Sequence, residues 1–166
     1  MHQIPAQYFR THESQSGSAR CVQHIHNFNH NSDGRREQMS LAEVEVFAGG
    51  ANIAGGGTAI QGDKSQLTAA TGGEAEKAID GDPATASLTD HNHIQRGGLW
   101  WKLDLGGEQN VDRIRITAPG SNGADLEGAF VYARDANYQI LWSARVKDAA
   151  DGSVHEFEVE TCCAGY

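Results

Sequence analysis

The sequence predicts an all-β domain, an antiparallel β-sandwich or jelly roll, on three observations. Apolar and polar residues alternate in several short segments of the chain, and this period of two is that of a half-buried strand. Residues that favour turns, namely glycine, asparagine, aspartate and proline, lie between these segments. No segment keeps the period of a helix. Short strands joined by turns are typical of sandwiches and jelly rolls.

Seven segments are predicted to form the strands. In chain order they span residues 21–25, 41–47, 100–106, 111–117, 128–134, 139–145 and 154–159. Segment 41–47 alternates almost without a break. This alternation places Glu43 and Glu45 on the face opposite Val44 and Val46.

The two tryptophans of segment 100–106, which has the sequence WWKLDLG, are predicted to face opposite ways, because adjacent strand residues do so. Trp101 shares a face with Leu103 and Leu105 and is assigned to the core. Trp100 then faces outward together with Lys102. An outward tryptophan on a strand is a candidate platform for a ligand ring.

The connections between the strands differ in character. Residues 27–39 are predicted to be a polar loop. Residues 48–75, dense in glycine, alanine, serine and threonine, are predicted to be a flexible surface connection. The triple glycine at 55–57 does not predict a phosphate site, because the residues after it favour a strand over the helix that such a site needs. Residues 1–19 are interpreted as an N-terminal arm ahead of one domain over residues 20–166.

The composition argues against two classes of partner. With 22 acidic and 13 basic residues the formal charge is −9. Nucleic-acid binding needs a basic surface, so no nucleic-acid partner is expected. The chain also lacks the run of ~18 apolar residues that a membrane span needs, so no span is expected. An acidic chain suits the binding of divalent cations.

Two features bear on the compartment. The N-terminal segment lacks the apolar core of a signal peptide, which indicates either a cytoplasmic protein or a mature chain whose signal was removed. Cysteine occurs at positions 21, 162 and 163, without the Cys-x-x-Cys spacing of a zinc site. One disulfide with a leftover thiol would fit an oxidising compartment.

Candidate functional residues concentrate in residues 77–106. This stretch begins with the acidic turn Asp80-Gly81-Asp82-Pro83, continues through a polar loop that holds His91 and His93, and ends in strand 100–106. A glycine-containing acidic turn can direct several carbonyl oxygens at one point, and calcium takes about 6–8 oxygen ligands. The alternative is a turn in which the aspartate only caps its own backbone.

Four sequence features together resemble a known family. They are Asn52-Ile53-Ala54, Ala78-Ile79-Asp80-Gly81-Asp82, the WWKLDLG run and Val111-x-x-Ile114-x-Ile116. Over about residues 41–159 the chain resembles a discoidin-type domain, the galactose-binding-like jelly roll of coagulation-factor C domains, fucose-binding lectins and many bacterial carbohydrate-binding modules. Segment 41–47 matches a late strand of that family but precedes the turn. The chain therefore resembles a permuted or tandem-array member that carries its last two strands at the N-terminus.

The resemblance implies a calcium site. In lectin members of the family the Asp-Gly turn binds calcium mostly through backbone carbonyl oxygens, and a late strand adds a carboxylate. Carried over residue by residue, the implied ligands are the carbonyls of Lys77, Asp82 and Ala42, the carboxylates of Asp80 and Glu43, and Ser87. The implied cofactor is calcium.

The resemblance also implies a sugar site in the loop after the turn. Fucose-binding members use a histidine in this loop and an Arg-x-Asp…Arg pattern after the strand that follows WWxxDLG. The second pattern is absent from residues 118–125, so specificity for fucose does not follow. The predicted ligand-binding residues are Asp90, His91, His93, Arg96 and Trp100, with Tyr138 and Trp142 as further candidate ring platforms.

No nucleophile elbow, His-Glu-x-x-His motif or Walker sequence is present, so an enzyme is not expected. The predicted function is a calcium-stabilised carbohydrate-binding or adhesive module, extracellular or at the cell surface, with a glycan or cell-surface polysaccharide as its partner. The alternative is a structural subunit of an extracellular assembly. In that case the N-terminal strands complete a neighbouring copy, and the chain is its own partner.

Overall fold

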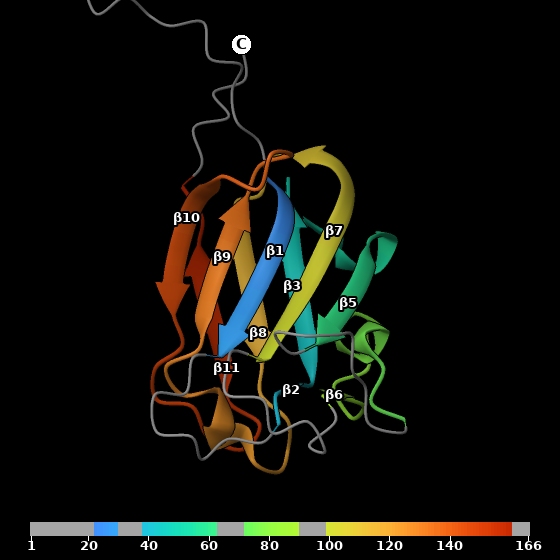
Figure 1. The fold of residues 1–166 in the computed structure, drawn as a ribbon, viewed down its shortest axis with the longest axis vertical. Helices are drawn as coiled ribbons and strands as arrows, with labels where there is room; N and C mark the ends of the chain where they lie inside the picture. Colours follow the sequence, from blue (N-terminus) through green and yellow to red (C-terminus); the bar gives the residue numbers. More distant parts are fainter. Residues whose placement is uncertain (1–21, 30–37, 63–71, 90–98, 161–166) are drawn as a thin grey trace, which may run out of the picture.

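Two antiparallel sheets face each other and enclose the core (Figure 1). The structure is a computed structural model, and it describes residues 22–29, 38–62, 72–89 and 99–160. The first sheet has the strand order β10-β9-β1-β7-β5 and the second the order β11-β8-β3-β4. A two-stranded ladder of β2 and β6 lies at one end of the sandwich.

The strands of the five-stranded sheet are β1 (Val22–Asn29), β5 (Thr58–Gly62), β7 (Leu99–Gln109), β9 (Phe130–Arg134) and β10 (Ile140–Arg145). Those of the four-stranded sheet are β3 (Glu43–Ala48), β4 (Ala51–Asn52), β8 (Arg113–Thr117) and β11 (Val154–Glu158). The short ladder consists of β2 (Ser40–Leu41) and β6 (Ser87–Leu88). Three 3₁₀ turns complete the described elements: η1 (Ala54–Gly56), η2 (Ala75–Ala78) and η3 (Gly123–Leu126).

The all-β sandwich that the sequence predicts is confirmed. Each of the seven predicted strands is present, as β1, β3, β7, β8, β9, β10 and β11. Alternation is a strong signal for these strands because one face of each sheet is buried against the other sheet. β7 begins at Leu99 and carries the WWKLDLG run.

The core lies between the sheets. Trp101 and Leu103 of β7, Ile114 and Ile116 of β8, and Val131 of β9 are all fully buried. The predicted inward orientation of Trp101 is therefore confirmed. Its indole Nε1 donates a hydrogen bond to the carbonyl of Ala75 at 3.0 Å, so the buried polar atom of this side chain has a partner.

β1 is the central strand of the five-stranded sheet although it comes first in the chain. It pairs antiparallel with β7, where Ile25 lies opposite Leu103, and with β9, where Ile25 lies opposite Ala133. β3 lies in the same way between β8 and β4. Both N-terminal strands thus complete the sandwich of their own chain.

Two connections differ from their predictions. The predicted flexible connection 48–75 contains β4, η1 and the edge strand β5. Gly57 lies so close to β7 that a Cβ there would be 2.6 Å from the carbonyl oxygen of Asp104, so glycine serves close packing rather than flexibility. The predicted loop 27–39 begins too early, because β1 continues to Asn29 and Asn27 is buried in the sheet.

Some predictions lie outside the described residues. They concern the N-terminal arm at 1–19 and the three cysteines at 21, 162 and 163. Within the described part of the chain, no helix is long and apolar enough to cross a membrane.

Candidate functional site

The acidic turn follows η2 and is fixed to the core through that 3₁₀ turn. η2 spans Ala75–Ala78, and Ala75 accepts the hydrogen bond of the buried Trp101 indole. Ala78 is fully buried. The carbonyl of Lys77 and the side chain of Asp80 therefore emerge from a segment that is anchored to β7.

Inside the turn, two aspartates cap their own backbone. Asp80 Oδ1 accepts a hydrogen bond from the backbone N–H of Asp82 at 2.9 Å, and Asp82 Oδ1 accepts one from the N–H of Ala84 at 2.9 Å. Gly81 has a φ of +80° between them, a conformation that favours glycine. Asp80 therefore caps its own turn, and this capping engages only one of its two carboxylate oxygens.

The second carboxylate oxygen of Asp80 points to a cluster of oxygen atoms around Thr85. Thr85 Oγ1 lies 2.7 Å from Asp80 Oδ2, 2.9 Å from the Asp82 carbonyl oxygen and 3.3 Å from the Lys77 carbonyl oxygen. Three of the atoms that the resemblance implies as ligands therefore lie around one hydroxyl. We call the Thr85 hydroxyl oxygen, Asp80 Oδ2 and the carbonyl oxygens of Asp82 and Lys77 the oxygen cluster.

The oxygen cluster has more acceptors than protons. A threonine hydroxyl has one proton to donate, and Asp80 Oδ2 is the nearest of its three acceptors. The Asp82 carbonyl also accepts the backbone N–H of Thr85 at 3.1 Å, but the Lys77 carbonyl shares the single hydroxyl proton with its neighbours. Oxygen atoms that converge in this way suit a hard cation such as calcium.

Glu43 of β3 lies beside the turn and brings a further carboxylate. Its side chain is only 6% exposed. Oε1 accepts a hydrogen bond from the N–H of Gly81 at 3.3 Å, whereas Oε2 is buried with no hydrogen-bond partner in the described part of the chain. A buried carboxylate oxygen without a partner costs free energy. This atom is therefore a second sign that a group is needed here.

The carboxylates at the turn repel one another, and this repulsion affects their pKa values. Burial raises the pKa of Glu43 to about 7, with the Gly81 N–H opposing the shift and the carboxylates of Asp80, Glu45 and Asp82 adding to it. The hydrogen bond from Thr85 is the main cause that lowers the pKa of Asp80, so that carboxylate is ionised. A divalent cation would relieve the repulsion between these groups.

The other implied ligands lie near in sequence but make different contacts. Ala42, between β2 and β3, is buried and donates its N–H to the carbonyl of Thr117 at 3.0 Å. Ser87 is buried in β6, and its hydroxyl donates to the carbonyl of Leu41 at 3.4 Å. In the described residues no three His, Cys, Asp or Glu side chains gather as a metal site, so the candidate site depends on carbonyl and hydroxyl oxygens.

Thr85 is the residue of this site that sequence reasoning missed. The resemblance assigned the hydroxyl to Ser87, which pairs with Leu41 in the short ladder. A signal for Thr85 was present, because it lies three residues after Asp82 and its N–H closes that turn on the Asp82 carbonyl. Threonine at such a position folds its hydroxyl back onto the turn.

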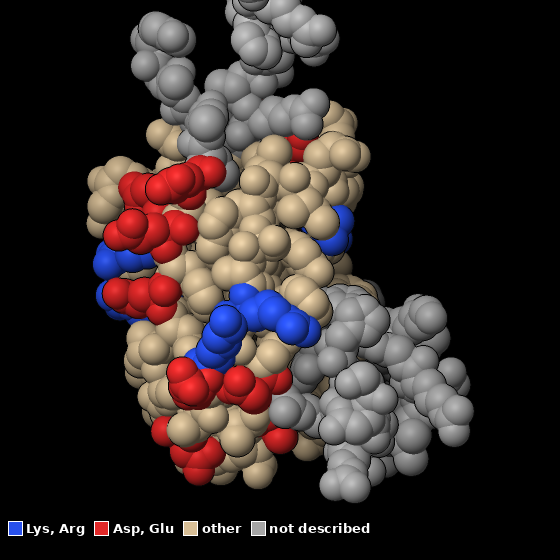
Figure 2. Space-filling model, turned by 90° about the vertical axis from the view of Figure 1, so that its left-hand side faces the viewer, with Lys and Arg blue, Asp and Glu red and all other residues tan. Residues whose placement is uncertain are grey.

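A groove of about 460 Å³ runs beside the turn over the outer face of the four-stranded sheet. Glu43 and Gly81 line one part of it, and Glu45, Arg115 and Glu156 another. Arg115 is ion-paired with both glutamates, at 3.1 Å to Glu45 and 2.7 Å to Glu156. Figure 2 shows acidic and basic residues side by side along its left edge, the side of this sheet.

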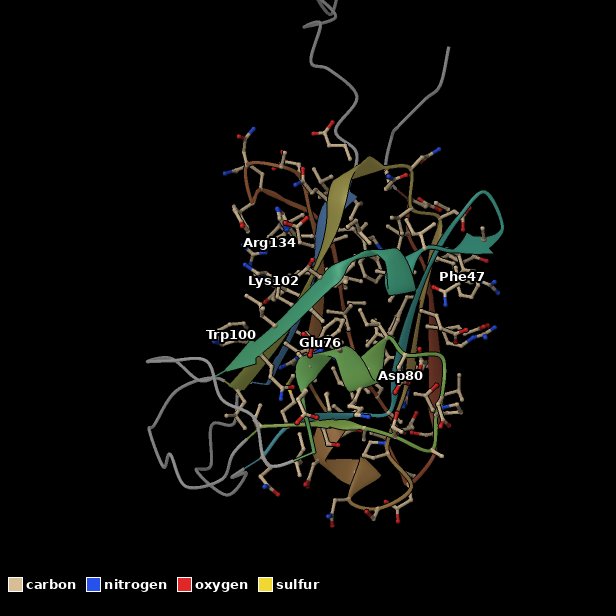
Figure 3. All side chains as sticks on the ribbon, turned by 90° about the vertical axis from the view of Figure 1, so that its right-hand side faces the viewer. Phe47, Glu76, Asp80, Trp100, Lys102 and Arg134 are labelled. Carbon is tan, nitrogen blue, oxygen red and sulfur yellow. The ribbon has the colours of Figure 1, made fainter. Side chains whose placement is uncertain are left out.

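Most of the predicted sugar-binding residues cannot be placed. Asp90, His91, His93 and Arg96 lie outside the described residues. Trp100 is half-buried at the start of β7. Figure 3 places it next to Lys102 on the outer face of the five-stranded sheet, on the opposite side of the molecule from Phe47 and apart from Asp80. The predicted outward orientation of Trp100 is confirmed.

A second hollow, of about 240 Å³, lies at the end of the sandwich near the β2–β6 ladder. Leu88 of β6 and Ser40 of β2 line it, and polar groups converge from the segment after β8. These groups are Ser121, Asn122 and Asp125. The predicted loop leaves the described chain immediately after this ladder, at Thr89.

The two further ring platforms behave differently. Trp142 packs edge to face against Phe157 of the other sheet, with ring centroids 5.8 Å apart, so it belongs to the sandwich interior. Tyr138 is 47% exposed and stacks on His24 of β1, with centroids 4.3 Å apart and an interplanar angle of 8°. Only Tyr138 remains an accessible ring.

Comparison with known proteins places the chain in a family. The family model described as "NedA-like, galactose-binding domain" matches residues 77–166, more than half of the 166 residues. The match begins at Lys77 and includes the acidic turn and the strands from β6 to β11. No curated protein and no solved structure matches the chain. The chain therefore belongs to the coagulation-factor C-type, NedA-like galactose-binding domain family, as its discoidin-type motifs predict.

Proposed function

We propose that the protein is a non-catalytic carbohydrate-binding module, stabilised by calcium and acting outside the cell or at its surface. Membership of a galactose-binding domain family supports a glycan as the partner. The observation that carries the calcium part is the oxygen cluster around Thr85 together with the unpartnered Oε2 of Glu43.

The donor set fits calcium in number and kind. The carbonyls of Lys77 and Asp82, the Thr85 hydroxyl and one oxygen each of Asp80 and Glu43 are all hard oxygen donors, and the Ala42 carbonyl that the resemblance implies would make six. Calcium takes about 6–8 such ligands at flexible geometry. With its carboxylates bound, the ion would hold the turn to β3 and so stabilise the end of the sandwich where β6 begins.

The proposed sugar site lies at the loop end of the sandwich, at the hollow between the β2–β6 ladder and residues 121–125. Its described lining offers hydroxyl, amide and carboxylate groups for sugar hydroxyls. The predicted ligand-binding residues His91 and Arg96 follow β6 in the sequence, outside the described residues, and are included in this proposal on the sequence alone. A glycan or cell-surface polysaccharide bound there would make the protein an adhesive module.

The calcium proposal is tested by thermal unfolding of protein stripped of metal. Calcium at about 100 times its Kd should stabilise the fold by about 2.7 kcal/mol, which corresponds to a rise in Tm of roughly 5–10 °C for a domain of this size. Asp80→Asn should abolish most of this rise. Glu158→Gln, an exposed carboxylate on β11, removes the same charge and should leave it intact. No rise with calcium, or an equal loss in both variants, would refute the site.

The glycan proposal is tested on a glycan array and by calorimetry with the glycans that bind. We expect binding that weakens about tenfold or more in His91→Ala and Arg96→Ala. Lys147→Ala is the control, because Lys147 is exposed after β10. Absence of binding to every glycan, in the presence of calcium, would contradict this part of the proposal.

A further inference from the structure

The outer face of the five-stranded sheet carries side chains in register across its strands. In one row Arg134 of β9, His24 of β1 and Asp104 of β7 lie opposite one another. In the next row Tyr132, His26 and Lys102 occupy the same strands. Because successive strand residues alternate between faces, both rows share the face that points away from the core.

Three cations on this face are held over aromatic rings. The guanidinium of Arg134 lies 5.2 Å from the ring centroid of Tyr132, that of Arg145 lies 4.3 Å from Phe130, and Lys102 Nζ lies 5.1 Å from Tyr138. We call this surface the cationic face, and it consists of Lys102, Arg134, Arg145, Phe130, Tyr132 and Tyr138. The rings of Phe130 and Tyr132 are parallel to within 5°, with centroids 5.7 Å apart.

The cations of the two sheets differ in their partners. Arg113 and Arg115 on the four-stranded sheet are ion-paired with Glu45 and Glu156. Both arginines also lie over the ring of Phe47. Within the described residues, Lys102, Arg134 and Arg145 lie over rings as well but make no ion pair. A ring positions a cation without using its N–H donors on a carboxylate. Lys102 and Arg145 can therefore bind an oxyanion from outside, whereas Arg134 has fewer donors left, because its Nη1 donates to the Tyr138 carbonyl at 3.1 Å and its Nε is buried.

The acidic group on this face is already engaged. Asp104 Oδ1 accepts the N–H of Gly106 at 2.8 Å and lies 3.9 Å from His24 Nδ1. Asp104 keeps its negative charge and interacts electrostatically with Lys102. The three cations outnumber this carboxylate, so the cationic face has net positive charge although the chain as a whole has a formal charge of −9. Figure 3 shows Arg134, Lys102 and Trp100 one below another along this face.

The spacing of the cations selects the kind of ligand. Strands are about 4.8 Å apart and residues i and i+2 about 6.7 Å apart, so the three cations lie roughly 12–16 Å from one another at their Cα atoms. The side chains of Lys102 and Arg134 both contact Tyr138, so one small anion can engage these two. Arg145 lies over Phe130 instead, beyond the reach of that same group. A ligand that engages all three must repeat its anionic groups along a chain.

We propose that the cationic face binds an acidic polysaccharide, one that carries carboxylate or sulfate groups at intervals along the chain. Each guanidinium or ammonium group pairs with one such group. Duplex DNA, with one charge per ~1.7 Å, would bring many more phosphates than there are cations to an acidic protein. A sparser polyanion meets less repulsion.

This surface is separate from the calcium turn and from the loop-end hollow, so it does not depend on the calcium or sugar site proposed above. Binding to the cationic face should persist in chelator. Calcium-dependent binding at the loop end should not. The two proposals can therefore fail independently.

The test is affinity electrophoresis of the whole chain in gels that contain polygalacturonate, dextran sulfate or neutral dextran, with chelator present. We expect retardation by at least one of the two acidic polymers and none by dextran, and a loss of retardation as salt is raised from about 50 to 300 mM, where surface charges are screened. Comparison of the two acidic gels distinguishes carboxylate from sulfate as the preferred group.

A charge-matched pair of double variants locates the binding. Lys102→Gln/Arg145→Gln should lower the affinity about tenfold, whereas Arg113→Gln/Arg115→Gln on the opposite sheet should leave it within about twofold. Lys102 and Arg145 are chosen because their side chains make no described hydrogen bond, while Arg134 donates to the Tyr138 carbonyl. Melting curves verify that both variants fold.

Three outcomes would overturn the proposal. The first is no retardation by either acidic polymer at low salt. The second is an equal effect of the two double variants. The third is binding of single- or double-stranded DNA as strong as that of the polysaccharides, which would mean that any polyanion suffices. If the wild-type chain dimerises in light scattering and the first double variant does not, without polymer binding, the face serves self-association instead.

Discussion

Thr85 Oγ1 lies 2.7 Å from Oδ2 of Asp80, and the same hydroxyl contacts the carbonyls of Lys77 and Asp82. One side chain thus gathers the oxygens on which the proposed calcium site depends. Thr85→Val keeps the shape and removes the hydroxyl. We expect it to weaken calcium binding about tenfold in calorimetry and to cost about 1 kcal/mol in metal-free protein. Thr85→Ser restores the hydroxyl, and an equally weak Ser variant would mean that the hydroxyl is not the cause.

Glu43 predicts the pH dependence of the metal-free protein. Burial raises its pKa from 4.5 to about 7, so the folded state holds a proton that the unfolded state releases. Its contribution to stability is therefore complete below pH 4.5 and is lost as the pH rises through about 7. Because one edge of the site meets water, we expect on the order of 2 kcal/mol rather than the full value of the shift.

The check on Glu43 is urea unfolding between pH 4 and 8 in chelator, with Glu43→Gln as the comparison. The glutamine keeps an oxygen for the Gly81 N–H and cannot ionise. The variant should become more stable relative to the wild type as the pH rises. If the free energies of unfolding of the two proteins depend on pH in the same way, Glu43 is excluded as the titrating group.

His26 should act in the opposite direction at lower pH. Its pKa is lowered to about 4, mainly by burial and also by the cations of Arg134 and Lys102 and by the neighbouring His24. Between pH 6.5 and about 4 the unfolded state therefore binds a proton that the folded state does not bind. The free energy of unfolding decreases as the pH decreases through this range. His26→Gln should flatten this part of the curve by about 2 kcal/mol, as measured by urea unfolding at pH 4, 5 and 6.5. A wild-type curve that does not fall there would contradict the assignment.

Trp101 should matter to the acidic turn as well as to the core. Trp101→Phe removes the indole that donates to Ala75 and leaves a buried carbonyl without that partner. We expect a loss of about 2–3 kcal/mol and a weaker response to calcium, because Ala75 begins the 3₁₀ turn that holds Lys77. Trp142→Phe, at a half-buried position against Phe157, should cost less and leave the calcium response unchanged. Equal effects in the two variants would contradict the link.

Gly57 and Gly56 form a matched pair for the close packing of η1 on β7. A Cβ at Gly57 would lie 2.6 Å from both the Asp104 carbonyl oxygen and Leu103 Cδ1, whereas one at Gly56 would meet nothing within 4 Å. Gly57→Ala should therefore destabilise the fold by about 2 kcal/mol or more, and Gly56→Ala should be nearly neutral. Thermal unfolding of the two variants compares them directly.

The sequence predicted the structure best for strands that bury one face and expose the other. The strands after Trp100 follow the alternation of apolar residues closely, and the inward orientation of Trp101 follows from its spacing to Leu103. Asp80 and Glu43 could be paired only through the family resemblance, because no local pattern relates β3 to the turn. Their contact, through the Gly81 N–H, depends on how two distant segments pack.

Other features had no strong local signal. β5 was obscured by a glycine-rich neighbourhood, and β2 and β6 are two residues each, too short for any period to show. The position of Tyr138 results from a turn in which Asp135 Oδ1 accepts the N–H groups of Asn137 and Gln139. Tyr138 itself takes a φ of +62°, which its residue type does not favour.

The central place of β1 has a consequence for how the chain acquires its structure. During synthesis β1 leaves the ribosome before the other described strands, yet Gln23 contacts Asp104, a residue 81 positions later. At about 5–20 residues per second, β1 stays without either neighbour for several seconds and waits longer still for β9. Contacts so distant in sequence slow folding. A chain truncated before residue 30 would keep β7 and β9 without β1 and would expose two unpaired strand edges, so β1 protects both neighbouring strands from aggregation.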